Sequence, residues 1–547
     1  MKSRKFFISS ALALSTVLGS VGTMMNAMPI SATAVTVSGF EEGHTFTAYQ
    51  VFKGTLVGDK IADIKWGDNV NVDNQAAIIA ALKGVADTSP LAPIKAKLTE
   101  ETPKADIIAN AISELGLDED SEGARELAKI FAENVSGTGT VISQETTNLG
   151  YGYYLIKDTT NNLDDYDVYG LSILQVHNNT PIDIKPKNAK PKVDKSIYDN
   201  DDHDGPDGSN VIGAGWGETA DYAIGESFQC KLTATINQCS DIKAYETYKL
   251  VLNDEWSAGI DYDTAVTPKV ELVINGDYEH PKTITNAVVG TPDSERKMTV
   301  TIADLKQHLT DPQDKDKIEV VVTYNAKLNA NAAVGNGFDA ENKQNNNKVY
   351  LEYSNNPNAE GTGTTAEDHV YVFMYTLENT KVNNLGESLG GAGFKLYKEA
   401  QGDNPAAYAT FDSDNKFAGW VDSIDKATEI KSSEATGTLG QFTMTGLDAG
   451  TYVLTETKVP EGYSKAADTK FTITAEHKEN SDAQAAAVIK IDNDESKKGI
   501  TVVNSKASNL PETGGMGTTI FYAAGGILAA GAVIALAATK KAKKEED

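Results

Sequence analysis

Short segments in which polar and apolar residues alternate recur along this chain, and this alternation limits its fold more than any other feature. Successive side chains of a β-strand point to opposite faces of the sheet, so alternation predicts strands with one buried face. Residues that favour turns separate these segments at short intervals, which is typical of β-sandwiches. The sequence therefore predicts a mainly β chain made of several sandwich domains.

Three predicted strands toward the C-terminus, at 371–382, 450–459 and 499–506, carry a polar residue on a face that is otherwise apolar. Read with a period of two, each of them shares its face with apolar residues: Lys381, Glu456 and Asn504. Any one of them alone is best explained as a strand-end group that reaches water. Three in one domain instead indicate an amine, a carboxyl and a carboxamide that share one apolar interior.

The middle of the chain repeats this arrangement. Lys195, Asp254 and Asn347 lie on apolar strand faces in the same order of amine, acid and amide. Asn345 and Asn346 stand directly before Asn347. Strand parity excludes Asn346, because it points to the opposite face, but it leaves Asn345 as an alternative.

Buried groups of this kind must be neutral, paired or reactive, because burying an unpaired charge costs several kcal/mol. Desolvation lowers the pKa of a lysine and raises that of a carboxyl, which favours a neutral amine beside a protonated acid. A neutral amine is a nucleophile, and a protonated acid can hydrogen-bond the carboxamide oxygen. Held together by the fold, the amine and the carboxamide can form an isopeptide bond with loss of ammonia.

The residues around these groups resemble two known families. The C-terminal domain resembles the Cna-B-type repeat of Gram-positive adhesins and pilins through Tyr-Val-Leu-Thr-Glu at 452–456, Lys-Val-Asn at 381–383 and Val-Val-Asn at 502–504. The middle domain resembles the fimbrial isopeptide-formation domain of backbone pilins through residues 246–254 and 347–357. The resemblance implies immunoglobulin-like or Cna-type sandwiches and two Lys–Asn bonds: Lys381–Asn504, promoted by Glu456, and Lys195–Asn347, promoted by Asp254.

The N-terminal domain is similar to pilin N-terminal domains through Phe-Thr-Ala-Tyr-Gln-Val-Phe at 46–52 and Trp-Gly at 66–67. Between predicted strands at 45–52 and 152–156, segments with helical spacing occur at 74–85, 104–115 and 121–135. The domain departs from the bond-forming pattern, because Lys157 stands where the motif has a glutamate. We expect a sandwich with a helical insertion and without an isopeptide bond.

The end of the chain combines an apolar run at 518–539 with four lysines behind it and a pentapeptide before it: Leu510, Pro511, Glu512, Thr513 and Gly514. The run is roughly twenty residues long, enough to span a bilayer, and the lysines would hold its end in the cytoplasm. The combination looks like the sorting signal of Gram-positive surface proteins. This resemblance implies that a sortase cleaves between Thr513 and Gly514 and joins Thr513 to an amine.

A proline-rich linker at 181–192 separates the first two domains and predicts an extended, exposed connection. Backbone pilins present the amine that accepts the sortase product in a motif ending Tyr-Pro-Lys-Asn at this place. Here Pro186 and Asn188 match that motif, and Lys185 replaces its tyrosine. By this resemblance Lys187 is the linkage residue, with neighbours that could take its role: Lys185, Lys190 and Lys192.

Charge and cysteine content narrow the function further. A net charge of −29 argues against a nucleic-acid partner, and we expect no cofactor and no metal. The acidic stretch 199–207 does not match the ligand positions of a twelve-residue calcium loop and is interpreted as a solvated loop. Cys230 and Cys239 would lie ~30 Å apart if the chain between them were extended, so a disulfide requires a turn and stays open.

These features predict a signal peptide at 1–34, three domains at 35–185, 190–367 and 369–506, and a sorting signal at 507–547. The predicted function is the shaft subunit of a covalent surface pilus without external substrate. In this prediction, sortase joins identical subunits and peptidoglycan holds the base of the pilus, with accessory pilins as possible further partners. The C-terminal helix is expected to hold the precursor in the membrane. The alternative is a wall-anchored monomeric adhesin or accessory pilin that binds a host ligand.

Overall fold

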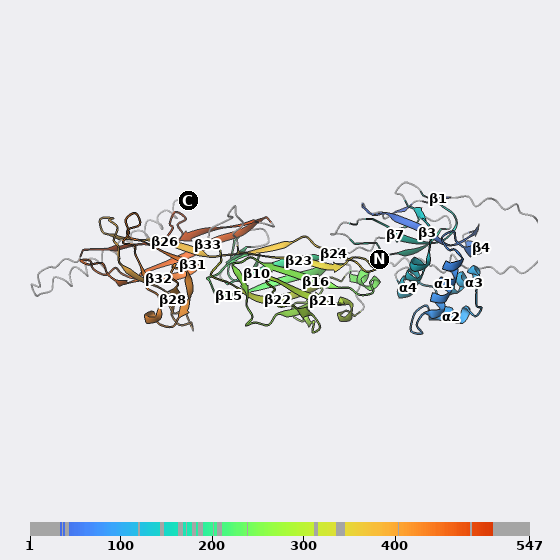
Figure 1. Ribbon diagram of the computed structural model, residues 1–547, viewed down its shortest axis with the longest axis horizontal. Coiled ribbons are helices and arrows are strands. Elements are labelled where there is room, and N and C mark those ends of the chain that lie inside the picture. Colours follow the sequence, from blue (N-terminus) through green and yellow to red (C-terminus); the bar gives the residue numbers. More distant parts are fainter. Residues whose placement is uncertain are drawn as a thin grey trace, which may run out of the picture.

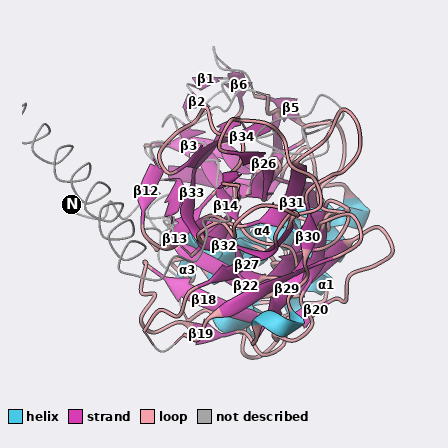
Figure 2. Cartoon of the chain, turned by 90° about the vertical axis from the view of Figure 1, so that its left-hand side faces the viewer, coloured by secondary structure: helices cyan, strands magenta, loops and turns pink. Residues whose placement is uncertain are grey.

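The structure, a computed structural model, describes residues 33–35, 37–38, 43–58, 60–118, 121–142, 147–161, 163, 168–170, 172–177, 182–183, 190–200, 202–204, 210–237, 239–310, 316–334, 345–402, 404–481 and 484–506. These residues form three β-rich units in a row, from the first (blue) to the last (orange) (Figure 1). In the end-on view the units lie behind one another along the same axis (Figure 2). The prediction of a mainly β chain with tandem domains is confirmed.

The first unit is built on an antiparallel sheet of order β4-β3-β7-β8, with β5 paired to β3. Helices cover one face of this sheet, and their apolar residues share a core with it. The small pairs β1-β6 and β2-β9 complete the described part of the unit. The strands are β1 Thr33–Val35, β2 Val37–Ser38, β3 Phe46–Val57, β4 Lys60–Trp66, β5 Thr140–Val141, β6 Thr147–Leu149, β7 Gly152–Asp158, β8 Ile173–His177 and β9 Ile182–Asp183.

The helices of the first unit are α1 Val72–Gly84, α2 Ala92–Lys97, α3 Ala105–Glu114 and α4 Glu122–Asn134. Three of them match the segments predicted from helical spacing. The sequence prediction missed α2, because six residues are too few to show a helical period. Side chains cap two of the starts: Asn71 accepts from the backbone N–H of Asn74 at α1, and Ser121 accepts from that of Ala124 at α4.

The middle unit is a sandwich of two sheets, each seven-stranded among the described residues. One has the order β13-β10-β15-β22-β18-β19 with β17 on β22, and the other β14-β25-β23-β16-β21-β20 with β24 on β23. A hairpin, β11-β12, lies beside them. The strands are β10 Lys192–Asp199, β11 Asp202–Asp204, β12 Asn210–Ile212, β13 Gly215–Gly217, β14 Thr219–Asp221, β15 Ser227–Ile236, β16 Leu250–Trp256, β17 Ile260–Tyr262, β18 Lys269–Ile274, β19 Lys282–Thr283, β20 Val288–Val289, β21 Lys297–Ile302, β22 Ile318–Leu328, β23 Asn345–Ser354, β24 Thr362–Thr364 and β25 Asp368–Phe373, with 3₁₀ turns η2 Cys239–Ala244 and η3 Leu305–His308.

The last unit packs a sheet of order β31-β26-β35 against a larger one, β29-β28-β27-β32-β33-β34 with β30 on β27. Its first and last strands, β26 and β35, are parallel neighbours, which places Lys381 opposite Val502 and Asn383 opposite Asn504. The elements are β26 Tyr375–Asn383, β27 Gly393–Lys398, β28 Ala407–Phe411, β29 Phe417–Val421, η4 Ile424–Lys426, β30 Ile430–Lys431, β31 Gln441–Leu447, β32 Gly450–Lys458, β33 Thr469–Ser481, β34 Gln484–Ile491 and β35 Thr501–Asn504.

The chain passes from the middle to the last unit at Met374. β25 pairs with β23 and β14 of the middle unit, so the single strand predicted at 371–382 is in fact two strands in different sheets. The apolar cores of the two units are continuous across this junction. Buried polar contacts cross it as well: the Tyr375 hydroxyl donates to Asp221 at 2.5 Å, and Thr219 contacts His477 at 2.7 Å.

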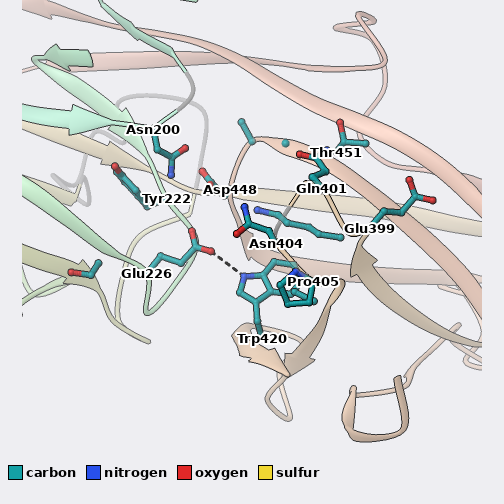
Figure 3. Close-up of a pocket in the computed structure, with 15 residues that line it drawn as sticks. Asn200, Tyr222, Glu226, Glu399, Gln401, Asn404, Pro405, Trp420, Asp448 and Thr451 are labelled. Atoms are coloured by element: carbon teal, nitrogen blue, oxygen red, sulfur yellow. Dashed lines mark hydrogen bonds between the residues drawn. The ribbon is translucent and has the colours of Figure 1, made fainter. Parts of the chain in front are cut away.

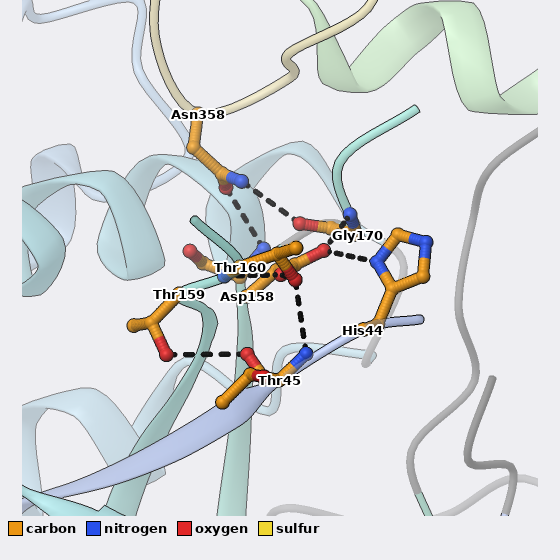
Figure 4. A network of polar contacts seen from close by, with 8 residues as sticks. His44, Thr45, Asp158, Thr159, Thr160, Gly170 and Asn358 are labelled. Atoms are coloured by element: carbon orange, nitrogen blue, oxygen red, sulfur yellow. Dashed lines mark hydrogen bonds and ion pairs between the residues drawn. The ribbon is translucent and has the colours of Figure 1, made fainter. Parts of the chain in front are cut away.

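The first and middle units meet through polar contacts and through Val168, which belongs to the apolar core that the middle and last units share. Lys129 of α4 pairs with Glu246 at 2.9 Å. The Asn358 side chain donates to the Gly170 carbonyl at 2.8 Å and accepts from the Ser172 N–H at 2.9 Å. Gly170 in turn donates to Asp158, which pairs with buried His44 at 2.6 Å (Figure 4). This chain of contacts ties the end of β7 to the middle unit.

Several predicted features lie outside the described residues. They are the signal peptide at 1–34 apart from the backbone of Thr33 and Ala34, the linkage lysines Lys185 and Lys187, the pentapeptide 510–514 and the apolar run 518–539. Within the part of the chain that the structure describes, no helix has both the length and the apolar character needed to cross a membrane.

The capped start of α1 provides a test of the helical layer. We expect Asn71→Ala to destabilise the first unit by about 1 kcal/mol, because the substitution leaves the N–H of Asn74 without its acceptor. Asn71→Asp, which keeps an acceptor, serves as the control. Denaturant unfolding followed by circular dichroism measures both, and equal midpoints for Asn71→Ala and Asn71→Asp would contradict the assigned cap.

Candidate functional site

The middle sandwich brings an amine, an acid and an amide together between its two sheets. Lys195 comes from β10 of one sheet, and Asp254 and Asn347 come from β16 and β23 of the other. All three are at most 1% exposed. The Lys195 Nζ lies 2.5 Å from Asp254 Oδ1, so the predicted amine and acid are in direct contact.

A tyrosine hydroxyl lies in the same cluster. Tyr324 Oη accepts from Lys195 Nζ at 3.2 Å and from Asn347 Nδ2 at 2.6 Å. Sequence reasoning missed Tyr324, because a tyrosine on the buried face of β22 reads as an ordinary core aromatic residue. The Cys230 side chain is buried beside these groups, opposite Tyr324 in the pairing of β15 with β22.

Burial dominates the electrostatics of this cluster. It raises the pKa of Asp254, while the nearby Lys195 amine opposes that rise. It also raises the pKa of Tyr324 well above its usual value and that of Cys230 to about 11. The phenol and the thiol are therefore neutral at physiological pH, and the acid is shifted toward its protonated form.

The structure distinguishes the two candidate asparagines. The Asn345 side chain is used by backbone groups: it accepts from the Ala333 N–H at 2.7 Å and donates to the carbonyls of Ala333 and Val372 at 2.9 and 3.0 Å. Asn347 Oδ1 and Asp254 Oδ2 are instead buried without a hydrogen-bond partner among the described residues. Of the two asparagines, Asn347 is therefore the one whose side chain contacts the cluster of Lys195, Asp254 and Tyr324.

The last unit assembles a second cluster at the pairing of β26 with β35. Lys381, Glu456 and Asn504 are at most 2% exposed. Both carboxylate oxygens of Glu456 accept from Asn504 Nδ2, at 3.0 and 3.1 Å, and one of them also accepts from the Ala466 N–H at 2.8 Å. The acid and the amide predicted from strand parity are therefore hydrogen-bonded.

The amine of the second cluster is held by backbone groups. Lys381 Nζ donates to the carbonyls of Val382 and Val502, each at 3.1 Å. Burial lowers the pKa of Lys381, and the negative charge of Glu456 opposes this shift. The lowered pKa increases the fraction of neutral, nucleophilic amine.

The first unit has Lys157 at the position where the bond-forming motif has a glutamate. Lys157, on β7, is half-buried and donates to the Ala132 carbonyl of α4 at 3.2 Å. Desolvation lowers its pKa. In this unit His44 Nδ1 instead contacts the buried Asp158 carboxyl at 2.6 Å (Figure 4), and Asp158 also accepts from the backbone N–H of Gly170 in the loop toward the middle unit. The absence of an isopeptide bond in this unit remains a prediction.

Cys230 is a free thiol in the structure, so the disulfide to Cys239 that the sequence left open is not formed. Cys239 begins the turn η2, after β15 has carried the chain away from Cys230. Among the described residues, no group of three or more His, Cys, Asp or Glu side chains is arranged to hold a metal ion.

A pocket of about 580 Å³ lies at the junction of the middle and last units. Trp420 projects into it and donates from Nε1 to Glu226 at 3.0 Å (Figure 3). The Lys398 amine lies 5.2 Å from the centroids of the Trp420 and Tyr452 rings. The hydrogen bond of Trp420 with Glu226 joins the two units at this pocket, and the contacts of Lys398 lie within the last unit.

Two segments match protein-family models. Residues 375–498 match SpaA, a prealbumin-like fold domain, and residues 502–547 match the LPXTG cell wall anchor motif. The first segment contains Lys381 and Glu456, and the second contains Asn504 and the pentapeptide. No curated protein matches the chain.

Solved pilin structures are similar to this chain at low identity. The T6 backbone pilin of serotype M6 Streptococcus pyogenes is 16% identical with a TM-score of 0.45, over 87% of this chain and 98% of that one. The major pilin RrgB from Streptococcus pneumoniae is 15% identical (TM-score 0.39; 68% and 86%). The major pilin SpaD from Corynebacterium diphtheriae is 18% identical (TM-score 0.37; 68% and 86%).

The two matched family models indicate the location of the protein. An LPXTG motif is the attachment signal of proteins linked to the Gram-positive cell wall, and the SpaA segment directly precedes it. The chain is therefore a cell-wall-anchored surface protein whose last unit is a prealbumin-like domain.

Proposed function

We propose that this protein is the shaft subunit of a sortase-assembled pilus, stiffened by autocatalytic isopeptide bonds between Lys195 and Asn347 and between Lys381 and Asn504. The observation that carries the proposal is the burial of an amine, an acid and an amide together in two successive units of a wall-anchored chain. A buried lysine and carboxylate are costly unless they pair or react, so two such sets need an explanation.

The reaction in the middle unit starts from the contact of Lys195 with Asp254. The ammonium gives a proton to the acid, and the neutral Nζ attacks Cγ of Asn347. A new bond forms between Lys195 Nζ and Asn347 Cγ, and the bond between Cγ and Nδ2 breaks. Nζ loses a proton, and the Nδ2 group gains one and leaves as ammonia. The protonated Asp254 can donate to Asn347 Oδ1 and stabilise the charge that develops there.

The reaction in the last unit has the same balance with a different acid contact. Glu456 touches the nitrogen of Asn504 that would leave, and its charge acts on Lys381, so we assign to Glu456 the transfer of a proton from the Lys381 amine to that nitrogen. Because burial lowers the pKa of Lys381, a larger fraction of its amine is neutral and able to attack. Because both partners lie on neighbouring strands, they react at the high effective concentration of an intramolecular pair.

The bonds would suit a subunit that carries tension. In the last unit the bond would join the first strand, β26, to the last, β35, so a force between the ends bypasses the strands between them. Each bond would also close a loop of well over 100 residues, which stabilises the folded state by about 5 kcal/mol in the chain-entropy description of crosslinks. Thr513 and Lys187 would provide the links between subunits.

The first test is the intact mass of residues 35–509. We expect the measured mass to be lower than the sequence mass by two ammonia molecules. In Glu456→Ala the difference should be one ammonia molecule, because the bond of the last unit does not form. Glu387→Ala, which removes an exposed acid near Asn383, is the control and should keep both losses. A wild-type mass equal to that of the sequence would refute both bonds.

The second test separates the two asparagines of the middle unit. Asn347→Ala should abolish the ammonia loss of that unit, because it removes the carbon that Lys195 attacks. Asn345→Ala should keep the loss and instead lower stability, since it removes three contacts to backbone groups. Peptide mapping with tandem mass spectrometry reads the crosslink, and a Lys195–Asn345 peptide would reverse the assignment.

The third test addresses polymerisation in cells that express the cognate sortase. Lys187→Ala should abolish the high-molecular-weight ladder on denaturing gels, while Thr513→Ala, which removes the acyl donor, sets the baseline. A second variant that replaces Lys185, Lys187, Lys190 and Lys192 by alanine covers substitution by a neighbour. Ladders that persist in this variant would favour a different linkage residue, and a wild type without ladders would favour an anchored monomer.

A further inference from the structure

We propose that Tyr324 is a catalytic residue of the middle unit, and that its hydroxyl relays a proton from the attacking Lys195 amine to the leaving nitrogen of Asn347. This inference rests on the proposed function, because it concerns the formation of the Lys195–Asn347 bond. It adds a residue to that site that neither the strand pattern nor the family resemblance supplies.

The geometry that carries the inference is a bridge between the two reacting side chains. Tyr324 Oη lies 3.2 Å from Lys195 Nζ and 2.6 Å from Asn347 Nδ2. These two nitrogens are the ones that exchange places on Cγ during the reaction. The side chain is 1% exposed, so water has little access to the same position.

Aminolysis of an amide needs proton transfer at both nitrogens. The attacking nitrogen must lose a proton once it has bonded to carbon. The nitrogen of the carboxamide must gain one, because NH₂⁻ is a much poorer leaving group than ammonia. A hydroxyl between the two nitrogens can do both in one step. Tyr324 Oη takes a proton from Lys195 Nζ as it gives its own to Asn347 Nδ2, so the phenol is regenerated and ammonia departs.

The acid of the cluster is placed for a different task. Asp254 contacts the lysine through Oδ1, and its other oxygen is buried without a partner, as is Asn347 Oδ1. We assign the proton taken up by Asp254 to the carbonyl oxygen of Asn347, which is the other oxygen of the cluster that is buried without a partner. Asp254 then acts on the oxygen side of the amide and Tyr324 on the nitrogen side.

The surroundings hold the phenol in place and keep it protonated. The Tyr324 ring packs edge-on against Trp256, with centroids 5.8 Å apart, and in a tilted arrangement against Tyr262, with centroids 5.9 Å apart. Burial keeps the pKa of Tyr324 well above its usual value. The hydroxyl therefore carries the proton that the relay must donate.

The last unit provides a comparison within the same molecule. There the Glu456 carboxylate itself contacts Asn504 Nδ2, at 3.0 and 3.1 Å, and Lys381 donates to backbone carbonyls. Toward the amide nitrogen, the acid of the last unit thus makes the contact that the tyrosine hydroxyl makes in the middle unit. The two bonds of one chain should depend on different residues for proton transfer to the leaving nitrogen.

The experiment follows both crosslinks in the full chain as it is made by cell-free translation. Samples are quenched over time, digested, and the Lys195–Asn347 and Lys381–Asn504 peptides quantified by mass spectrometry. In Tyr324→Phe we expect the middle crosslink to form at least about tenfold more slowly, within the usual range of general acid–base catalysis, and the last one at the wild-type rate. Tyr375→Phe is the matched control, since it removes another hydroxyl from a fully buried ring.

Further arms separate catalysis from folding. 3-Fluorotyrosine at position 324 keeps the hydroxyl and should restore the middle crosslink. The uncrosslinked fraction of Tyr324→Phe should melt like Asp254→Asn, which lacks the bond for another reason; melting well below it would mean that the hydroxyl acts through packing and would overturn the inference. Equal rates in Tyr324→Phe and Tyr375→Phe would overturn it too. Absence of the crosslink in the wild type would instead contradict the proposed function itself.

Discussion

The cost of burying charged groups in an apolar sandwich is the constraint on which the rest of this molecule depends. Lys195 and Lys381 are almost completely inaccessible to water. Lys195 contacts the acid Asp254, and Lys381 is close enough to Glu456 for the charge of that acid to act on its pKa. An isolated charge in such a place would cost several kcal/mol. Conversion of lysine and asparagine to a neutral secondary amide removes this cost permanently, and the same step closes a covalent loop.

The fold determines what each bond would hold together. In the last unit the partners come from two parallel neighbouring strands that begin and end the sandwich. In the middle unit they come from opposite sheets, so the bond would join the two layers. The continuous core and the contacts of Asp221 with Tyr375 then couple the two units, whereas the first unit is attached through loop contacts such as those of Asn358.

The sequence predicted the parts of this structure that follow from periodicity. The period of two placed Lys381, Glu456 and Asn504 on inward faces, because a strand with one buried face has a single possible parity. It could not place the break at Met374, since residues on both sides are apolar and buried in different sheets. It also left Asn345 and Asn347 equivalent, because they share a face and differ only in their neighbours.

Residues that act through tertiary contacts were beyond the reach of sequence patterns. Tyr324 reaches the middle cluster from a strand that lies more than 100 positions from Lys195, and nothing local distinguishes it from the other buried tyrosines. The sequence left open whether Cys230 forms a disulfide or is a free thiol. The pairing of β15 with β22 shows that it lies opposite Tyr324, beside the cluster. Residues of this kind can be identified only from the contacts between the two packed sheets.

An atomic-resolution crystal structure of the secreted chain tests the central claim most directly. We predict continuous electron density between Lys381 Nζ and Asn504 Cγ and between Lys195 Nζ and Asn347 Cγ, at an amide bond length of about 1.33 Å. Separate side chains at both sites, with the nitrogen and carbon at a non-bonded distance of about 3 Å or more, would contradict the account.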